Sequence, residues 1–357
     1  MKDASDVRTM LVDSATRLFA DHVDSKTLDA AKRDGWSPAL WKIVEDAQLA
    51  LVSVPEEAGG AGGTLSDLAA VLRIAGNAAA PVPLAETAIA AWMLAEAGLE
   101  IPPGPLAFGP VQGDKVVARK EGAEWKLSGR LKRVPWARMA SHLVLLVSSK
   151  DGDMVARVDA RVCAISAGRN LASEPRDDVE LDNVSITSNR VAPASAAINH
   201  AALRLRGALS RALMMAGALE KALALATRYA TERSQFGRKI GQFQAIQQEL
   251  ARFAGEVAAA VAAALSAAGA LERGEDALLP IAAAKIRTAQ AAHEGAMIAH
   301  QVHGAIGVTD EYALHHSTLR LWSWREEFGN EAAWSMELGR VIAAGGADRL
   351  WPTLAQG

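Results

Sequence analysis

The spacing of hydrophobic residues changes character twice along this chain of 357 residues. Near the start, apolar residues recur every three or four positions, as at Val7, Leu11 and Ala15, and this period predicts amphipathic helices. From about residue 106 to 195, short apolar runs replace it, and the continuous run from His142 to Ser148 predicts a buried strand. The helical period then returns and continues to the end of the chain.

This pattern predicts an α+β fold that is mainly α, with three domains. They are an N-terminal helical domain over residues 1–104, a small middle β-barrel or sandwich over residues 105–196, and a C-terminal four-helix bundle over residues 197–357. In the last domain we expect long helices near residues 202–233, 242–272 and 277–303. Two of these helices are very rich in alanine, and small residues allow helices to pack closely.

Cap and turn residues predict where several elements begin. Ser37-Pro38 predicts a helix start, because serine caps a helix and proline suits its first turn. Thr64 and Asp67 predict a cap for a helix from residue 65 to 76. Residues 49–54 are expected to form a short extended run.

Two hairpins are expected in the middle of the chain. Residues 124–135 predict one of them, with Gly129 at its turn. Asp151-Gly152 predicts the turn before a strand near residues 154–158.

The connection between the first two long C-terminal helices is basic and rich in glycine. Gly237 and Gly241 interrupt the helical pattern, and Arg233, Gln235 and Arg238 lie in the same break. A helix–turn–helix corner of this kind can hold an anion, because an arginine and the N-terminus of the next helix offer donors together. An ordinary basic connection between two helices is the alternative.

Composition excludes several classes of protein. Half of the residues are hydrophobic and the formal net charge is -3, so the chain is globular and a nucleic-acid partner is not expected. The single cysteine, Cys163, excludes an internal disulfide and suits a reducing cytoplasm. The chain starts without an apolar signal core, and its alanine-rich stretches are amphipathic, so we expect neither export nor a membrane span.

Four distinctive segments follow one another along the chain: Leu51-Val-Ser-Val-Pro-Glu-Glu-Ala-Gly-Gly-Ala-Gly-Gly63, Trp125-Lys-Leu-Ser-Gly129, the segment Tyr229…Arg233-Ser-Gln-Phe-Gly237…Gln244, and Gln301-Val-His-Gly-Ala-Ile-Gly-Val-Thr-Asp-Glu-Tyr312. Together and in this order, they resemble the acyl-CoA dehydrogenase family of flavoproteins. The third is similar to the family's Arg-x-Gln-Phe-Gly…Gln signature. The fourth is similar to its Gln-x-x-Gly-Gly-x-Gly-x-Thr-x-Glu-Tyr motif, with Ala305 in place of the second glycine.

The resemblance implies FAD as the cofactor and a binding site shared between subunits. The residues that it assigns to FAD are Arg233, Gln235, Phe236, Gln244, Gln301, Gly304 and Ala305. A guanidinium suits the pyrophosphate, and small residues let backbone N–H groups approach it. The resemblance also places Arg211 near the thioester end of the substrate, whereas an arginine on the surface of a helix is the alternative.

The resemblance further implies a reaction and its partners. The reaction is α,β-dehydrogenation of an acyl-CoA thioester, as in fatty acid β-oxidation, with electrons passing to an electron-transfer flavoprotein. The chain would form a homodimer or homotetramer, or a heteromer with a homologous subunit.

The carboxylate that should accept the α-proton is not at its expected positions. Counted without gaps, the family's glutamate falls on Phe328, and the other position that the family uses carries Ser210. Glu327, one residue earlier, is therefore the candidate base, and Glu331 is a further candidate. A solvated glutamate, or one paired with Arg325, is the alternative for Glu327. The missing base motivates a second hypothesis, a subunit of a heteromeric acyl-CoA dehydrogenase whose homologous partner supplies the carboxylate.

Three further features have two interpretations each. Trp136 stands where the family has a segment beside the flavin, and either shields the flavin or belongs to the core. His300 and His303 have a spacing that suits a metal on a helix face, but they coincide with the flavin motif, so no metal is expected. Cys163 has no activating pattern around it, so nucleophilic hydrolysis is not expected either.

Overall fold

The structure is a computed structural model that describes residues 4–111 and 113–355. This part of the chain forms two compact units. The first, called the helical unit below, contains residues 4–25, Ala69–Ala80 and 208–355, and the second, called the sheet unit, contains Lys26–Leu68 and Pro81–Gly207. The mainly helical α+β class is confirmed, whereas the domain boundaries at residues 104 and 196 stay a prediction.

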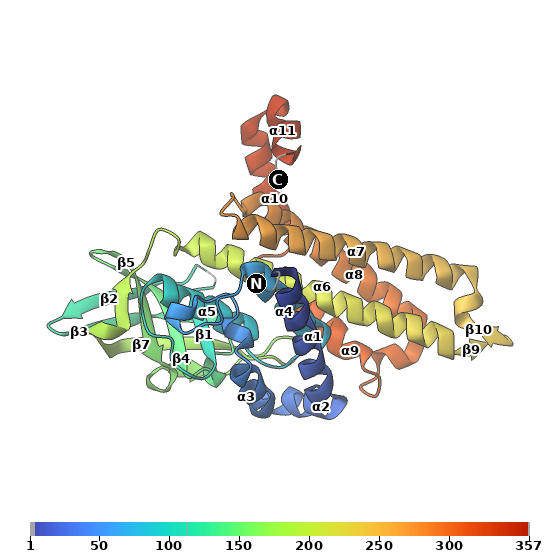
Figure 1. The fold of residues 1–357 in the computed structure, drawn as a ribbon, viewed down its shortest axis with the longest axis horizontal. Coiled ribbons are helices and arrows are strands. Elements are labelled where there is room, and N and C mark those ends of the chain that lie inside the picture. Colours follow the sequence, from blue (N-terminus) through green and yellow to red (C-terminus); the bar gives the residue numbers. More distant parts are fainter. Residues whose placement is uncertain (1–3, 112, 356–357) are drawn as a thin grey trace. The chain divides into compact units, whose positions relative to one another are not determined.

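Helices make up most of the described chain (Figure 1). They are α1 Ala4–His22, α2 Ser25–Asp34, α3 Pro38–Asp46, α4 Leu65–Asn77, α5 Leu84–Glu96, α6 His200–Glu232, α7 Gln244–Glu272, α8 Leu278–His303, α9 Leu314–Glu326, α10 Glu331–Gly345 and α11 Leu350–Ala355. The three long C-terminal helices, α6, α7 and α8, agree with the predicted ranges to within a few residues.

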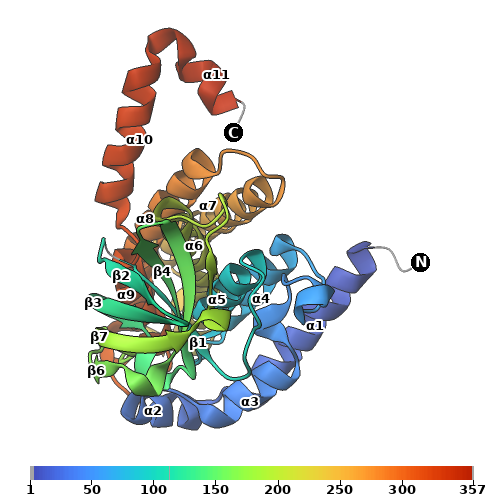
Figure 2. The same ribbon diagram turned by 90° about the vertical axis from the view of Figure 1, so that its left-hand side faces the viewer.

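The middle of the chain forms one eight-stranded sheet, seen from one side in Figure 2. Its strands are β1 Leu106–Gly109, β2 Val116–Glu121, β3 Glu124–Pro135, β4 His142–Ser149, β5 Gly152–Asp159, β6 Ala164–Ser166, β7 Arg176–Thr187 and β8 Val191–Pro193. The order is β6-β7-β3-β2-β4-β5-β8, and β1 pairs with β4 in parallel. The run predicted as a buried strand is β4, and the turn predicted at Asp151-Gly152 joins it to β5.

The core of the sheet unit explains why these short segments hold together. Leu127, Leu131, Leu143 and Val158 are fully buried in one hydrophobic cluster. On β3, the buried Leu127 and Leu131 have more exposed neighbours, whereas β4 is buried continuously from Leu143 to Val147. Alternation and continuous burial are the two patterns on which the strand predictions rested.

The predicted hairpin within residues 124–135 is wrong. Glu124–Pro135 is a single strand, and the hairpin turn lies before it, where Glu121 pairs with Glu124. Gly129 marks an irregularity in the pairing of β3 with β7, not a turn. A Cβ at Gly129 would lie 2.5 Å from the carbonyl oxygen of Lys115, so the glycine permits a close approach of two strands.

The predicted caps of two N-terminal helices are confirmed. The extended run predicted between these helices is wrong. The Ser37 hydroxyl accepts from the Leu40 N–H at the start of α3, and the Thr64 hydroxyl accepts from the Asp67 N–H at the start of α4. Residues 49–54 are not extended, because Leu49–Leu51 is a 3-10 helix. Gln48 precedes it with a left-handed φ of 53° and turns the chain.

The helical unit is built on closely packed long helices, and α7 and α8 lie side by side in it (Figure 1). Small residues set the spacing, because a Cβ at Gly295 would lie 2.3 Å from the ring of Phe253. By length and composition, α7 is the one described helix that could cross a membrane, with 33% of its most apolar window buried. The core helix of a soluble protein passes the same test of length and composition, so this finding is weak evidence for a membrane span.

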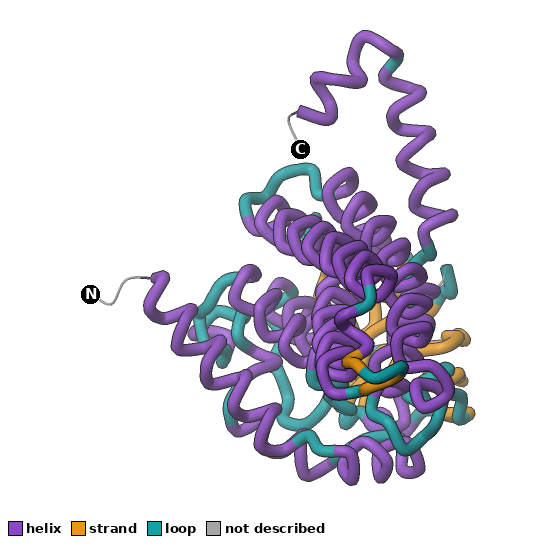
Figure 3. The backbone as a smooth tube through the Cα atoms, turned by 90° about the vertical axis from the view of Figure 1, so that its right-hand side faces the viewer, coloured by secondary structure: helices purple, strands orange, loops and turns teal. Residues whose placement is uncertain are grey.

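The connection between α6 and α7, where the sequence predicts a glycine-rich turn, contains a small hairpin. The strands β9 Ser234–Gln235 and β10 Arg238–Lys239 pair across Phe236 and Gly237, and the hairpin faces the viewer in Figure 3. Both turn residues have positive φ, 51° and 79°. Two such residues are what a two-residue hairpin turn requires, and Gly237 adopts this conformation without strain.

Candidate functional site

A cavity of about 550 Å³ in the helical unit is lined by three segments that are far apart in the sequence. They are the end of α6 with the hairpin β9–β10, the first turn of α7, and the end of α8 with the short helix that follows it. The lining residues are Tyr229, Arg233, Gln235, Phe236, Ile240, Phe243, Ile246, Gln301, Val302, His303, Gly304, Ala305 and Ile306.

The cavity brings together all but one of the residues that the resemblance assigns to FAD. Arg233, Gln235 and Phe236 line it from the hairpin side, and Gln301, Gly304 and Ala305 line it from the end of α8. Gln244 is the exception. It is exposed at the first position of α7 and is not among the lining residues.

The hairpin presents an aromatic side chain to solvent. Phe236 is 90% exposed, and its ring meets the ring of Phe243 edge to face, with centroids 6.2 Å apart. The Arg238 guanidinium lies 4.1 Å from the centre of the Phe243 ring. Lys239 donates to the carbonyl oxygen of Glu232 at 2.6 Å and ties β10 to the end of α6. The hairpin is thus held to its base while its tip stays uncovered.

The opposite wall of the cavity is formed where α8 ends. Gly304 has a φ of 62°, and a Cβ added there would meet no heavy atom within 4 Å, so its backbone is open to a bound group. The ring of His303 stacks on that of Tyr229 with centroids 4.7 Å apart, and it lies at the same distance from the ring of Tyr312. His303 Nδ1 donates to the carbonyl oxygen of Ala299, and burial lowers the pKa of His303, so the imidazole is neutral.

The residues of this cavity suit a dinucleotide. Arg233 supplies a guanidinium for a pyrophosphate, the two glutamines supply amides, and the open backbone at Gly304 allows a close approach. Flat aromatic faces at Tyr229 and Phe236 suit an aromatic base. FAD combines these chemical groups, so the side chains present fit it.

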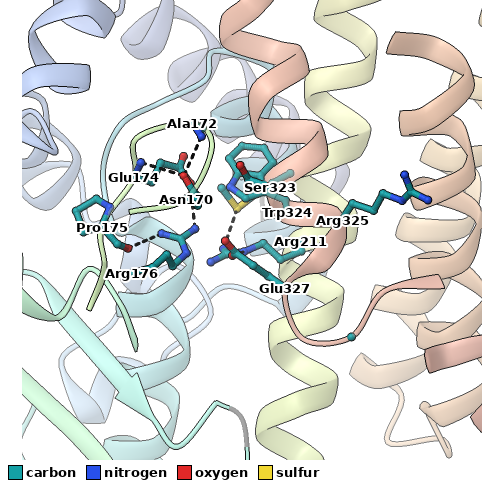
Figure 4. A network of polar contacts seen from close by, with 12 residues as sticks. Asn170, Ala172, Glu174, Pro175, Arg176, Arg211, Ser323, Trp324, Arg325 and Glu327 are labelled. Carbon is teal, nitrogen blue, oxygen red and sulfur yellow. Dashed lines mark hydrogen bonds and ion pairs between the residues drawn. The ribbon is translucent and has the colours of Figure 1, made fainter. Parts of the chain in front are cut away.

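A second group of candidate side chains lies on α6 and directly after α9. Arg211 Nε donates to Glu327 Oε2 at 2.6 Å, and Figure 4 shows the two side chains pointing toward each other. Arg211 is 1% exposed and Glu327 is 8% exposed. Arg211 is therefore not an arginine on a helix surface, and Glu327 is not a solvated glutamate.

Glu327 is also not paired with Arg325, which extends away from it in Figure 4. Arg325 Nε instead donates to Glu331 Oε2 at 2.9 Å, and its Nη2 donates to the other carboxylate oxygen. The hydrogen bond from Arg325 lowers the pKa of Glu331. Glu331 is engaged in this ion pair at the start of α10.

Phe328, the residue that follows Glu327, has an unusual backbone conformation. Phe328 has a φ of 56°, which is rare for a large side chain, and Gly329 follows with 97°. The Trp334 indole N–H donates to the carbonyl oxygen of Phe328 at 3.1 Å. The Phe328 ring lies 5.4 Å from the Arg211 guanidinium, so the position where the ungapped count puts the family's glutamate carries a buried ring beside an arginine.

The remaining features lie in ordinary packing. Trp136 is 3% exposed in the sheet unit, which agrees with a core tryptophan. His300 stacks on Trp322 and lies 3.1 Å from the Thr318 hydroxyl through Nε2. Burial raises the pKa of the Cys163 thiol to about 11, so it is a poor nucleophile.

Comparison with known proteins defines the class to which this fold and cavity belong. Residues 5–100 match the N-terminal domain of acyl-CoA dehydrogenases, and residues 197–332 match their C-terminal domain. Together these matches cover about two thirds of the chain, which belongs to the acyl-CoA dehydrogenase family. It is an FAD-dependent oxidoreductase of lipid metabolism that acts on the CH–CH group of acyl-CoA thioesters.

Three similar proteins show how far this likeness extends. The chain is 29% identical to acyl-CoA dehydrogenase IpdE2 of Mycobacterium tuberculosis, over 86% of this chain and 88% of that protein. The Tcur3481-Tcur3483 steroid ACAD aligns with a TM-score of 0.85 and 27% identity, over 96% of this chain and 99% of the other. The ChsE4-ChsE5 complex from Mycobacterium tuberculosis aligns with a TM-score of 0.86 and 23% identity, over 96% and 98%, and at that identity shows the fold alone.

Proposed function

We propose that this chain is an FAD-binding subunit of a heteromeric acyl-CoA dehydrogenase, and that a homologous subunit supplies the carboxylate that accepts the α-proton. The observation that carries this proposal is the ion pair between Arg211 and Glu327. It engages the one glutamate that stands next to the expected position of the base.

The ion pair between Arg211 and Glu327 affects whether Glu327 can act as a general base. A base works best when it exchanges its proton near the working pH. A guanidinium at 2.6 Å favours the ionised form of a carboxylate and makes it a weaker proton acceptor. Glu327 therefore serves to hold Arg211, and Phe328 fills the neighbouring position with a ring.

The resemblance gives the cofactor roles, and the cavity supports them because it gathers six of the seven residues. Arg233, Gln235 and Phe236 would meet the pyrophosphate and adenosine side of FAD, and Gln301, Gly304 and Ala305 would hold its adenine end. Gln244 would face the nucleotide from the first turn of α7. FAD, when bound, accepts the hydride that leaves the β-carbon of the thioester. The exposed Phe236 supports a site that a neighbouring subunit completes.

The partners are proposed from the relatives. Two similar structures carry two protein names each, the ChsE4-ChsE5 complex and the Tcur3481-Tcur3483 steroid ACAD, and this pairing supports a homologous second subunit. The substrate is an acyl-CoA, electrons leave to an electron-transfer flavoprotein, and the assembly works in the cytoplasm. Arg211 would stabilise the thioester end of the substrate.

A second function is supported by the burial of Glu327. In a homodimer or homotetramer, Glu327 would itself be the base, and the hydrogen bond that it accepts from Arg211 on α6 would orient it. Buried carboxylates held at one place are common at catalytic sites.

Purification of the chain with and without a homologous subunit distinguishes the two functions. The chain would be produced alone and together with a homologous acyl-CoA dehydrogenase subunit from the same source, and each product would be tested for flavin absorbance and for its mass. We expect a colourless or flavin-poor product from the chain alone and stoichiometric FAD in the mixed assembly. A yellow homomer that bleaches when acyl-CoA is added would contradict the heteromeric function.

A further inference from the structure

Lys285, in the first third of α8, is fully buried and binds the end of another helix. Its Nζ donates to the carbonyl oxygens of Trp324 at 3.2 Å, Arg325 at 2.7 Å and Gly329 at 2.9 Å. Its exposed fraction is 0%. These carbonyl groups lie on both sides of Glu327 and Phe328, so one side chain fixes the backbone before and after them.

The chemistry of these three bonds requires an ammonium group. A lysine ammonium has three N–H donors, whereas a neutral amine has only two. The last carbonyl groups of a helix lack partners within the helix and carry partial negative charge, so a cation is favoured there. Lys285 therefore caps α9 from a helix that begins 36 residues before α9.

The charged groups around Lys285 come from three elements. Glu326 and Glu327 at the end of α9 and Glu331 on α10 favour its charged form, and Arg211 on α6 opposes it. Burial has the largest effect and lowers the pKa of Lys285 to about 7. The number of protons on Lys285 therefore changes within the physiological range of pH.

We propose that Lys285 is a positioning residue, which fixes the loop after α9 so that Glu327 holds Arg211 in place for the thioester end of the substrate. The proposal rests on the proposed function only through the role of Arg211. When pH rises through about 7, Lys285 loses a proton and one of its three hydrogen bonds, and the loop loosens. The hold on Arg211 is thus complete below this pH and weaker above it.

The first test measures the loop directly and does not depend on activity. Amide hydrogen exchange of residues 324–331 would be compared between wild type and Lys285→Met in the purified FAD-loaded assembly of the full chain with its homologous subunit. We expect exchange at least about tenfold faster in the variant, because a helix end without partners frays. Unchanged exchange in this segment would overturn the proposal.

A matched control is available one turn further along α8. Thr288 is also fully buried, and its hydroxyl donates to the carbonyl oxygens of Ala284 and Lys285 within the helix. Thr288→Val removes a buried hydrogen bond without touching the loop, so exchange at residues 324–331 should stay as in wild type. Equal loosening in Lys285→Met and Thr288→Val would mean that Lys285 acts only through general stability and would also overturn the proposal. If Lys285→Met does not fold, Lys285→Gln, which keeps an amide donor, takes its place.

The second test measures whether Lys285 affects the binding of acyl-CoA through Arg211. In the active assembly, the KM of wild type for acyl-CoA should rise several-fold between pH 6 and pH 8, with kcat changing less than about twofold from this residue. Lys285→Met should have a raised KM that no longer depends on pH in this range. A KM of Lys285→Met equal to that of wild type at pH 6 would refute the role toward Arg211. A failure of the heteromeric function would appear instead as activity in the chain alone, with the exchange result intact.

Discussion

At the scale of single residues, the site differs from the family motif at the position of the catalytic carboxylate. The sequence alone places Phe328 where the family has glutamate and Glu327 one residue before it. Which of the two side chains reaches α6 depends on where α9 ends, and a shift of one residue turns a side chain to another face. The structure ends α9 at Glu326, and Glu327 then contacts Arg211.

Lys285 shows why part of the site could not be predicted. In an alanine-rich helix a lysine is expected to lie on the surface. Its partners are 39 to 44 positions away in sequence, at the end of a different helix. No local sequence pattern predicts such a contact. In contrast, six of the seven residues that the sequence assigns to FAD line one cavity, because they lie in motifs that keep their spacing.

Phe236 gives a prediction for the cofactor site. Because its side chain is 90% exposed, Phe236→Ala should change the free energy of unfolding by less than about 0.5 kcal/mol. The same change should weaken FAD binding by about tenfold, because an aromatic contact is lost. Titration of the assembly with FAD measures the affinity, and urea unfolding measures the stability. Met336→Ala, at another exposed residue outside the cavity lining, is the control and should leave FAD affinity unchanged.

At the scale of elements, helices were easier to predict than the links between them. The long helices follow from period alone, and the caps of α3 and α4 follow from Ser37 and Thr64. The course of the strands and turns depends on which strands pair with each other, and this pairing cannot be predicted from the local sequence. Gly129 looked like a turn, but β3 continues through it because β2 and β7 pair on either side. The hairpin β9–β10 was missed because its strands have only two residues each.

The packing of α4 against α6 within the helical unit gives a prediction about stability. A Cβ at Gly217 would lie 1.8 Å from the carbonyl oxygen of Arg73, so Gly217→Ala forces the two helices apart. We expect it to reduce the free energy of unfolding by at least about 2 kcal/mol. Gly255 lies on the exposed side of α7 with nothing near its Cβ position. Gly255→Ala should therefore be neutral or stabilise by up to about 1 kcal/mol.

Urea unfolding of both alanine variants, followed by circular dichroism, compares the two glycines directly. Similar midpoints for Gly217→Ala and Gly255→Ala would show that α4 and α6 do not pack as closely as the structure has them.

At the scale of the whole molecule, the order of helices, sheet and helices with four motifs was enough to predict the family. The matches to both acyl-CoA dehydrogenase domains confirm that prediction. What the family does not determine is which subunit removes the proton. That question depends on the buried pair of Arg211 and Glu327, and therefore on the partner with which this chain assembles.

The most direct test of this account is the rate of flavin bleaching by acyl-CoA in the assembled enzyme that carries Glu327→Gln. Glutamine keeps the shape of the side chain and an oxygen that can accept from Arg211, but it cannot accept the α-proton. If a homologous subunit supplies the base, the rate at saturating acyl-CoA should stay within about threefold of wild type, because no general base is lost. A loss of about a hundredfold or more, the size expected for removal of a general base, would contradict the account and assign the proton transfer to Glu327.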